Sequence, residues 1–259
     1  MRLEPVIGVL AGCGGAGAST LAAVLAATLG ERDGHAYLID CDPLGGGIDV
    51  LLGRERAPGP RWDQVRLRGG SLDPATLRES LPRWGRVSFL AADSARPIDP
   101  AALDQVVTAA AAMSPVLLDL SRSRSAARRT ALERCDQVLL VTAAEVRAVT
   151  ATALVAAALD PARSHVVVRG SSRNLPAQHI GDLLGLPVLG ELPSDPAGAG
   201  SGGLDVGRLR RRTRRFALLI LDRLIAPPAA SAPSTAVRPE PRIPPTALAS
   251  DRSGRGEAA

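Results

Sequence analysis

The feature that most constrains the fold is an alternation of short apolar runs with longer Ala- and Leu-rich segments through residues 5–225. The apolar runs predict strands, and they are Val6–Ala11, His35–Asp40, Val87–Ala91, Val116–Leu120, Val138–Thr142, His165–Val168 and Val188–Leu189. Segments between them, such as Thr20–Leu29, predict helices. Because the strands are apolar throughout rather than alternating, both faces of their sheet should be buried. The pattern predicts an α/β fold, a doubly wound, mostly parallel sheet with helices on both faces.

Two Asp-Pro pairs mark helix starts within this region. Asp73-Pro74 and Asp99-Pro100 each place an N-cap residue directly before a proline at the first helical position. We therefore expect one helix to begin after Asp73 and another after Asp99.

The composition changes at Ala226. Seven of the last 34 residues are proline, and most of the others are Ala, Ser and Arg, so little apolar surface is left to bury. The sequence predicts two parts: a globular domain over residues 1–225 and a Pro/Ala-rich disordered tail over residues 226–259.

Several classes of protein are disfavoured by the composition. Aromatic residues make up only 2% of the chain, which argues against a single-stranded nucleic-acid binder built on stacked rings. Cys13, Cys41 and Cys135 form no CxxC pair, which argues against a disulfide framework or a zinc site. The first residues lack the apolar stretch of a secretion signal, and no run of 18 apolar residues occurs. We expect a cytoplasmic protein, with peripheral attachment to a membrane as an alternative.

A glycine-rich segment follows the first predicted strand and precedes the first predicted helix. In that position glycines let several backbone N–H groups point at one anion, and the helix N-terminus adds its dipole. The segment fits the P-loop pattern at Gly12, Gly17 and Ser19, but Ala18 stands where the pattern has lysine. We interpret it as a phosphate-binding loop; the alternative is a tight strand–helix connection. The predicted binding residues are Gly12, Cys13, Gly14, Gly15, Ala16, Gly17, Ala18, Ser19 and Thr20.

Carboxylates end two of the other predicted strands. Asp40 and Asp42 close the second apolar run, and Asp119 lies in the run Val116–Leu120. The carboxyl ends of parallel strands face the crevice in which ligands bind. There a carboxylate holds Mg²⁺ or orients an attacking water, although any one of these residues could equally be a helix cap. We predict that the Ser19 hydroxyl and Asp119 hold Mg²⁺.

These segments together carry a resemblance to a known family. The strings GGAGAST, LIDCDP, VLLDL, CDQVLLVTAAEV and LLGLPVLGELPSD, in this order, resemble the MinD/ParA P-loop ATPases with a deviant Walker A loop. The wording GCGGAGAST is most similar to the CpaE/TadZ branch and related septum-site-determining proteins. The resemblance implies ATP and Mg²⁺ bound between two protomers of a homodimer. It also implies a role in placing secretion, pilus or division proteins at a chosen site.

The chain departs from that family at both lysines. They fall on Cys13 and Ala18, and no lysine occurs anywhere in the chain to replace them, since all 31 basic residues are Arg. Losing a charged hydrogen bond to phosphate costs about 1.5–3 kcal/mol of binding. Losing a donor aimed at transition-state charge costs about 2.7–4 kcal/mol, or some 10²–10³ in rate. We expect weak hydrolysis or none.

The resemblance also assigns roles at the other strand ends. It makes Asp40 and Asp42 part of the first switch and candidate catalytic residues, with Asp42 placed near the attacking water. Arg122 and Arg124 lie in the second switch and are candidates to substitute for the missing phosphate charge; the alternative is that they are solvated loop residues. Many CpaE-like proteins carry a receiver-like domain ahead of the ATPase. This chain begins at the first strand, so we expect none.

The last predicted helix, Leu204–Ile225, is strongly basic. Residues 205–225 hold 7 Arg against 2 acidic residues, whereas residues 1–204 are nearly balanced, with 20 against 21. Helical spacing predicts one arginine face, made of Arg208, Arg211, Arg212 and Arg215. This face is either a solvated side of a docked helix or a contact for an anionic membrane, DNA or an acidic partner.

Three functions remain open on the sequence. The first is a nucleotide-binding positioning factor with impaired hydrolysis. The second is an interaction scaffold that has kept the fold without a working nucleotide site. The third is a ParA-like DNA-binding ATPase that uses the arginine face.

Overall fold

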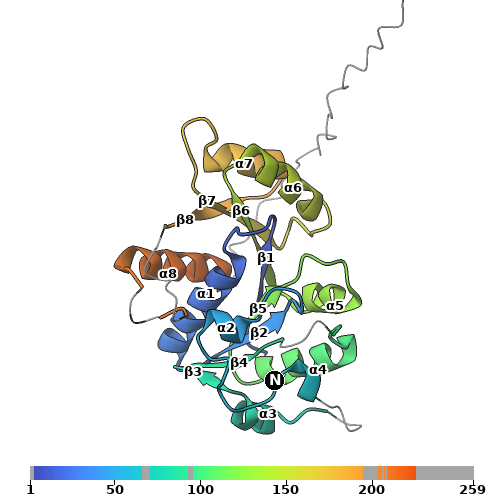
Figure 1. Cartoon of the computed structure of the whole chain (residues 1–259). Coiled ribbons are helices and arrows are strands. Elements are labelled where there is room, and N and C mark those ends of the chain that lie inside the picture. Colours follow the sequence, from blue (N-terminus) through green and yellow to red (C-terminus); the bar gives the residue numbers. More distant parts are fainter. Residues whose placement is uncertain are drawn as a thin grey trace, which may run out of the picture. The chain divides into compact units, whose positions relative to one another are not determined.

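A single mixed sheet organises the computed structural model, which describes residues 3–65, 71–92, 96–194, 203–205, 207 and 209–225. Eight strands of the described residues lie in the order β3-β4-β2-β5-β1-β6-β7-β8 (Figure 1). Only β3 runs antiparallel to its neighbour; the other pairs are parallel. The strands are β1 Val6–Ala11, β2 Ala36–Cys41, β3 Arg83–Trp84, β4 Val87–Leu90, β5 Val116–Leu120, β6 Gln137–Ala143, β7 Ser164–Arg169 and β8 Val188–Leu192.

Helices connect the parallel strands, as parallel connections require. The α-helices are α1 Ala18–Asp33, α2 Ile48–Leu51, α3 Pro74–Ser80, α4 Pro100–Ala111, α5 Ala126–Arg134, α6 Val146–Ala156, α7 Ala177–Leu184 and α8 Arg211–Ile225. A short 3₁₀ turn, η1, spans Trp62–Gln64. Among the described residues, no helix is both long and apolar enough to cross a lipid bilayer.

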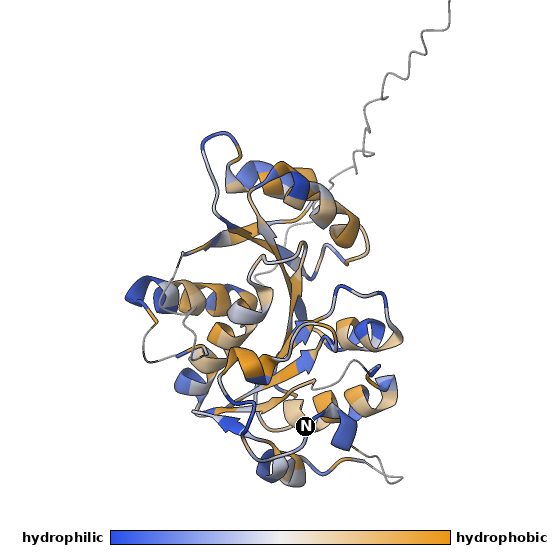
Figure 2. Cartoon of the chain, in the orientation of Figure 1, coloured by the Kyte–Doolittle hydropathy of each residue, from blue (hydrophilic) through white to orange (hydrophobic). Residues whose placement is uncertain are grey.

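Apolar cores lie on both faces of the sheet. The central strand β1 sends Ile7 and Val9 into the core beneath α1 and α8, and Val6 and Leu10 into the core beneath α4–α7. The inner strands are therefore drawn mainly in the apolar colours of Figure 2, whereas the edge strand β3 is blue. Helix α1 is buried along most of its length because it packs against β1, β2, β5 and α8. The predicted doubly wound fold is confirmed.

Most of the predicted elements are also present. All seven apolar runs form strands, and the two Asp-Pro pairs start helices as expected: Asp73 accepts a hydrogen bond from the Thr76 amide, and Asp99 from the Ala101 amide. The two-residue strand β3 was not predicted.

The predicted start of the last helix was wrong. The helix begins at Arg211, not at Leu204, and only its later part has the expected spacing. Leu204 and Leu209 are buried against the α1 side of the sheet without being helical, because a segment can bury apolar side chains in an irregular conformation. The predicted tail, residues 226–259, lies outside the described residues.

Candidate functional site

The loop between β1 and α1 has the backbone of an anion cradle. Gly15 and Gly17 adopt left-handed φ angles of 70° and 95°, which residues with a Cβ rarely adopt. Gly12 passes so close to α6 that an added Cβ would lie 2.2 Å from Thr152 Oγ1. The α1 N-cap is Gly17, so the first turn of the helix has no capping side chain from that residue. Its N–H groups are of the kind that bind phosphate.

Cys13 and Ala18, the positions at which the MinD/ParA ATPases that the sequence resembles have lysine, differ in their exposure. Cys13 is half-buried, and Ala18 is only 5% exposed and packs in the apolar core beside α1. The loop itself therefore offers no positive side chain.

Two arginines from other strands approach the loop instead. Arg169, the last residue of β7, has its Nη1 3.8 Å from the position that a Cβ on Gly17 would take. Arg122, which follows β5, has its Nη2 4.0 Å from the corresponding position on Gly14. Arg122 was predicted as a substitute for the missing charge. Arg169 was not predicted as a charge near the phosphates, although its place directly after an apolar run at the carboxyl edge of the sheet was a usable signal.

The three predicted carboxylates gather beside the loop because their strands are neighbours. Asp40 on β2 is directly opposite Asp119 on β5. Burial, and then the charge of Asp40, raise the pKa of Asp119 to about 7. Burial is also the main reason that the pKa of Asp40 rises to about 6, although backbone hydrogen bonds partly oppose it. The raised pKa values show that burial and the neighbouring carboxylates disfavour the negative charge of Asp40 and Asp119.

Asp119 lies near Ser19, the second residue of α1, which follows the glycine loop. The Ser19 side chain acts on Asp119 as a hydrogen-bond donor, and this lowers the pKa of Asp119 against the larger effect of burial. The two residues predicted from the sequence to hold Mg²⁺ therefore lie near each other. No group of three or more His, Cys, Asp or Glu among the described residues is arranged to hold a metal by itself.

Asp40 has both carboxylate oxygens occupied by the backbone. Oδ1 accepts from the Asp42 amide at 2.9 Å, and Oδ2 accepts from the amides of Ile48 at 3.0 Å and Ala92 at 3.3 Å. The indole N–H of Trp62 donates to the Asp40 carbonyl at 2.6 Å. These bonds fix the turn after β2, which gives Asp40 a positioning role in this structure.

Asp42 is the more accessible member of the three. It is half-buried, and its Oδ1 accepts hydrogen bonds from the Ser121 hydroxyl at 3.0 Å and the Leu44 amide at 3.2 Å. Ser121 follows β5, so this contact joins the two predicted switch segments. Gly46 and Gly47, which follow Asp42 in the chain, have left-handed φ angles of 88° and 81°.

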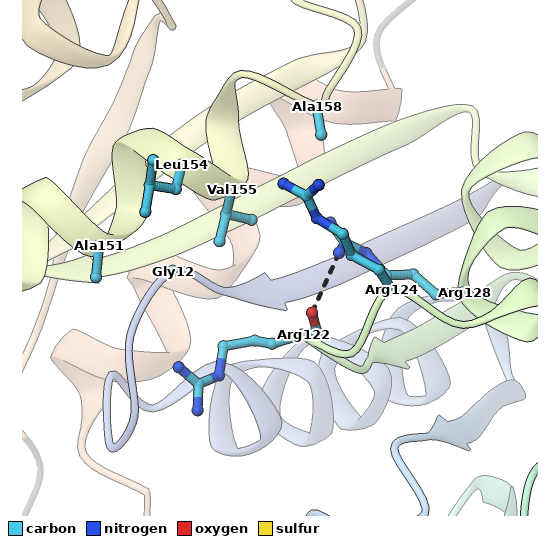
Figure 3. A pocket seen from close by; sticks show the side chains of 8 residues that line it. All are labelled: Gly12, Arg122, Arg124, Arg128, Ala151, Leu154, Val155 and Ala158. Carbon is cyan, nitrogen blue, oxygen red and sulfur yellow. Dashed lines mark hydrogen bonds between the residues drawn. The ribbon is translucent and has the colours of Figure 1, made fainter.

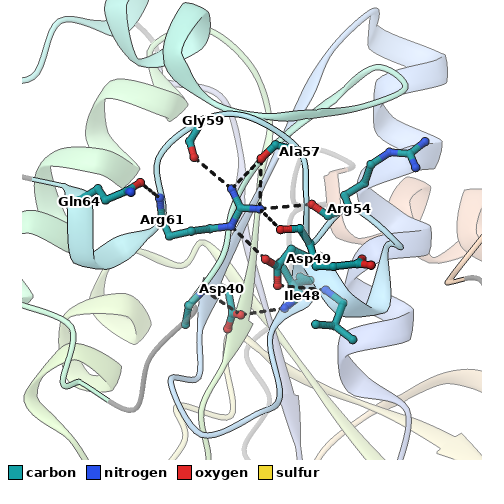
Figure 4. Close-up of polar contacts among 11 residues, drawn as sticks. Asp40, Ile48, Asp49, Arg54, Ala57, Gly59, Arg61 and Gln64 are labelled. Atoms are coloured by element: carbon teal, nitrogen blue, oxygen red, sulfur yellow. Dashed lines mark hydrogen bonds and ion pairs between the residues drawn. The ribbon is translucent and has the colours of Figure 1, made fainter.

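A buried ion pair fixes the segment behind the carboxylates (Figure 4). Arg61 Nε lies 3.0 Å from Asp49 Oδ2, with both side chains less than a tenth exposed. The remaining guanidinium nitrogens donate to backbone carbonyls, including that of Gly59 at 3.2 Å and that of Arg54 at 3.2 Å. Arg61 therefore closes the loop that follows α2.

A cavity of about 740 Å³ opens on the other side of the glycine loop. Its walls come from α1, from the residues after β7 and β8, and from α8; they include Gly17, Thr20, Arg169, Leu192, Arg212 and Phe216. Such a volume is typical of small-molecule sites. It continues from the helix N-terminus, so that a phosphate on the loop and a base in the cavity would belong to one ligand.

The cavity also changes the interpretation of the basic helix. Arg212 lines the cavity, whereas Arg211 and Arg215 are simply exposed. The fourth residue of the predicted face, Arg208, lies outside the described residues. The structure therefore brings part of this face to the candidate ligand site.

A second pocket, of about 250 Å³, lies between α6 and the segment after β5 (Figure 3). Its polar wall consists of Arg122, Arg124 and Arg128, and Gly12 lies at its edge. Arg124 was predicted to stand near phosphate. In Figure 3 its guanidinium points toward α6 and away from the glycine loop, whereas that of Arg122 extends toward the loop.

Comparison with known sequences finds similar proteins but no matching family model. No family model matches the sequence. Two uncharacterized proteins of Mycobacterium tuberculosis, from strains CDC 1551 / Oshkosh and H37Rv, are 38% identical over 216 residues, covering 80% of this chain. The chain spans 60% of the length of these relatives.

Solved structures of ParA and MinD ATPases share the fold. A ParA family ATPase from Chlorobium tepidum matches with a TM-score of 0.69 at 17% identity, covering 86% of this chain and 99% of that one. The cell division protein MinD of Aquifex aeolicus gives 0.68 at 21%, with coverages of 89% and 99%. The MinD of Pyrococcus horikoshii, solved with Mg-ADP, gives 0.64 at 19%, with coverages of 86% and 97%. This chain therefore has the fold of the ParA and MinD ATPases.

Proposed function

We propose that this chain is a nucleotide-binding positioning factor of the MinD/ParA family, nearest to its CpaE/TadZ branch. It binds ATP and Mg²⁺ at Gly12–Thr20 and hydrolyses ATP slowly or not at all. The observation that carries the proposal is the glycine loop with left-handed Gly15 and Gly17, next to which Ser19 lies near the Asp119 carboxyl. This arrangement combines a phosphate cradle with a pair of hard oxygen donors.

The residues present fit a magnesium ion. Mg²⁺ prefers oxygen ligands, and in nucleotide sites it is held by one or two protein groups together with phosphates. Ser19 and Asp119 would be those groups. A bound cation would also neutralise the negative charge of Asp119, whose pKa is raised by burial and by the charge of Asp40. When bound, the ion neutralises charge on the phosphate oxygens.

The cations near the loop support binding rather than rapid turnover. Arg169 and Arg122 reach toward Gly17 and Gly14 from outside the loop. They would offset part of the charge that a lysine at position 18 normally balances. A guanidinium held on another strand is not aligned as the P-loop lysine is, which is why we propose slow hydrolysis.

The wider role rests on the resemblance. The uncharacterized relatives name no activity, and the solved ATPases share only the fold with this chain. We propose a cytoplasmic homodimer that recruits secretion, pilus or division proteins, with its nucleotide base in the cavity beside Arg169.

A fluorescence titration with a methylanthraniloyl derivative of ATP tests the site. Gly17→Val places a branched side chain at a left-handed φ of 95° within the cradle. The matched control is Gly34→Val at the other end of α1, where φ is 88° and no other group lies within 4 Å. Both changes strain the backbone, but only the first blocks the loop.

The proposal expects saturable, Mg²⁺-dependent binding by the wild type and the Gly34→Val variant, and loss of binding in Gly17→Val. Equal and negligible binding by all three proteins would overturn it and favour the nucleotide-free scaffold.

A further inference from the structure

The arginine pocket between α5 and α6 contains uncompensated positive charge. Arg122, Arg124 and Arg128 line it, and no carboxylate is among its lining residues. Among the described residues, no acidic side chain forms an ion pair with any of the three. Arg124 is exposed at the mouth, so it is accessible to a ligand from solution.

Arg128 is the least satisfied member of this group. It is only 5% exposed, and its Nη1 donates to the Arg122 carbonyl at 3.2 Å. Its Nε is buried and has no hydrogen-bond partner in the part of the chain that the structure describes. Burial, and then the charge of Arg124, lower the pKa of Arg128. Buried donors are rarely left unpaired, so this guanidinium lacks an acceptor.

The opposite wall of the pocket is an apolar helix face. Ala151, Leu154 and Val155 recur at i, i+3 and i+4 on α6, and they line the pocket together with Ala158, which lies just after the helix. Leu154 is 70% exposed, and Val146, two turns earlier on α6, is 75% exposed. Large apolar side chains at this exposure, two turns apart on one helix, offer apolar contacts to a partner beside the pocket.

The two walls together define the chemistry of the occupant. A guanidinium fork binds carboxylates in a bidentate manner, and the helix face requires apolar side chains next to that carboxylate. A volume of about 250 Å³ is below the usual range of small-molecule pockets but holds one acidic side chain.

We propose that the arginine pocket and the outer face of α6 form a docking site for an acidic, leucine-bearing segment of a partner protein. A Glu or Asp side chain of that segment enters between Arg124 and Arg128, and its apolar neighbours pack on Leu154 and Val146. The proposal does not rest on nucleotide binding, because none of these contacts requires a ligand on the glycine loop.

Fluorescence anisotropy with labelled synthetic peptides tests this site on the full chain without nucleotide. One probe alternates glutamate with leucine, and its counterpart alternates glutamine with leucine. We expect the glutamate peptide to bind the wild type about 10- to 100-fold more tightly, the range of a charged hydrogen bond. Equal affinity for the two peptides would overturn the proposal.

Variants locate the binding site. Arg124→Gln should reduce the preference for glutamate by about tenfold or more, and Arg129→Gln, an exposed arginine on the same helix α5 that does not line the pocket, should leave it unchanged. Arg128 is buried, so a substitution there could unfold the protein. A melting curve therefore first shows that Arg128→Lys is folded. A folded variant that loses the preference for the glutamate peptide as Arg124→Gln does supports the site. Equal effects at Arg124 and Arg129 would indicate charge attraction without a site and contradict the proposal.

The apolar wall and two other occupants are tested in the same assay. Leu154→Ser should weaken the glutamate peptide several-fold. If Leu154→Ser has no effect and inorganic phosphate displaces the peptide completely, the pocket holds a free anion and the proposal fails. If Arg124→Gln abolishes self-association but leaves peptide binding unchanged, the occupant is a second copy of this chain, and the proposal fails as well.

Discussion

Two clusters of like charge lie at the same edge of the sheet and do not neutralise each other. Asp40, Asp42 and Asp119 form the acidic cluster, in which burial raises the pKa of two members. Arg122, Arg124 and Arg128 form the basic cluster, which begins only three residues after Asp119 in the chain. No ion pair joins the two clusters in the described part of the chain. Uncompensated buried charge is costly, so the buried members Asp119 and Arg128 reduce stability unless a group of opposite charge binds beside them.

The pair Asp49–Arg61 shows how the same chain treats charge that serves structure. It is buried, and the guanidinium is satisfied by the carboxylate and by backbone carbonyls. Arg61 has a carboxylate partner and stabilises the fold, whereas Arg128 is buried without an ion pair to any residue that the structure describes. We infer that the first arginine is structural and that the second binds a group from outside the described residues.

The largest expected effect tests that distinction. Arg61→Leu leaves Asp49 buried and unpaired, and we expect the free energy of unfolding to fall by about 3–5 kcal/mol in urea denaturation. Arg32→Leu, which removes partly exposed pairs with Asp33 and Asp222, should cost at most about 1 kcal/mol. Similar losses in both variants would show that the Asp49–Arg61 pair is not the structural element that we describe.

The second test restores a cation to the glycine loop. Ala18→Lys places an ammonium group where the family has one, and we expect ATP turnover to rise by about 10²–10³. Ala18→Met is the control, because it adds a similar chain without charge. Turnover in the wild type equal to that of Ala18→Lys would contradict the proposed impairment of hydrolysis.

The third test concerns the arginine that reaches the loop from β7. Arg169→Gln removes a cation whose Nη1 lies close to Gly17, so ATP affinity should fall about tenfold in a filter-binding assay. Arg173→Gln, a few residues later in the chain, serves as the charge-matched control. If both substitutions weaken binding alike, Arg169 contributes only to the general field of the protein.

The smallest effect should appear in the pH dependence of stability. Burial raises the pKa of Asp119 from its ordinary value of 3.8 to about 7. A carboxyl with a raised pKa destabilises the fold when ionised: the cost is absent below the unfolded value and complete above the folded one. Without Mg²⁺, Asp119→Asn should therefore raise the melting temperature on the order of 5 °C at about pH 8, and by less at about pH 5.

The control for this experiment is Asp182→Asn, which removes an exposed carboxylate on α7. A gain for Asp119→Asn that is the same at both pH values would mean that the Asp119 carboxyl is not the titrating group.

The sequence predicted what depends on local pattern. Apolar runs located the strands, and glycine spacing located the loop, because buried parallel strands and left-handed turns restrict residue type directly. Ser19 and Asp119 were predicted together because a P-loop hydroxyl and a carboxylate at the end of a parallel strand face the same crevice. The position of Asp40 opposite Asp119 depends on the order of the strands, which was not predicted.

What could not be predicted depends on contacts between distant segments. Arg128 looks like an ordinary arginine in the sequence, and only the pocket that it lines together with residues of α6 gives it a role. The start of α8 was misplaced because Leu204 and Leu209 fit a helical period while being buried in an irregular segment.

Calorimetric titration of Mg²⁺–ATP into the wild-type chain tests the central claim most directly: a glycine loop without lysine, next to Ser19 and Asp119, still holds a nucleotide. The account predicts saturable heat with Mg²⁺ and a clearly weaker signal when the metal is chelated. No heat with any purine nucleotide, with or without Mg²⁺, would contradict it.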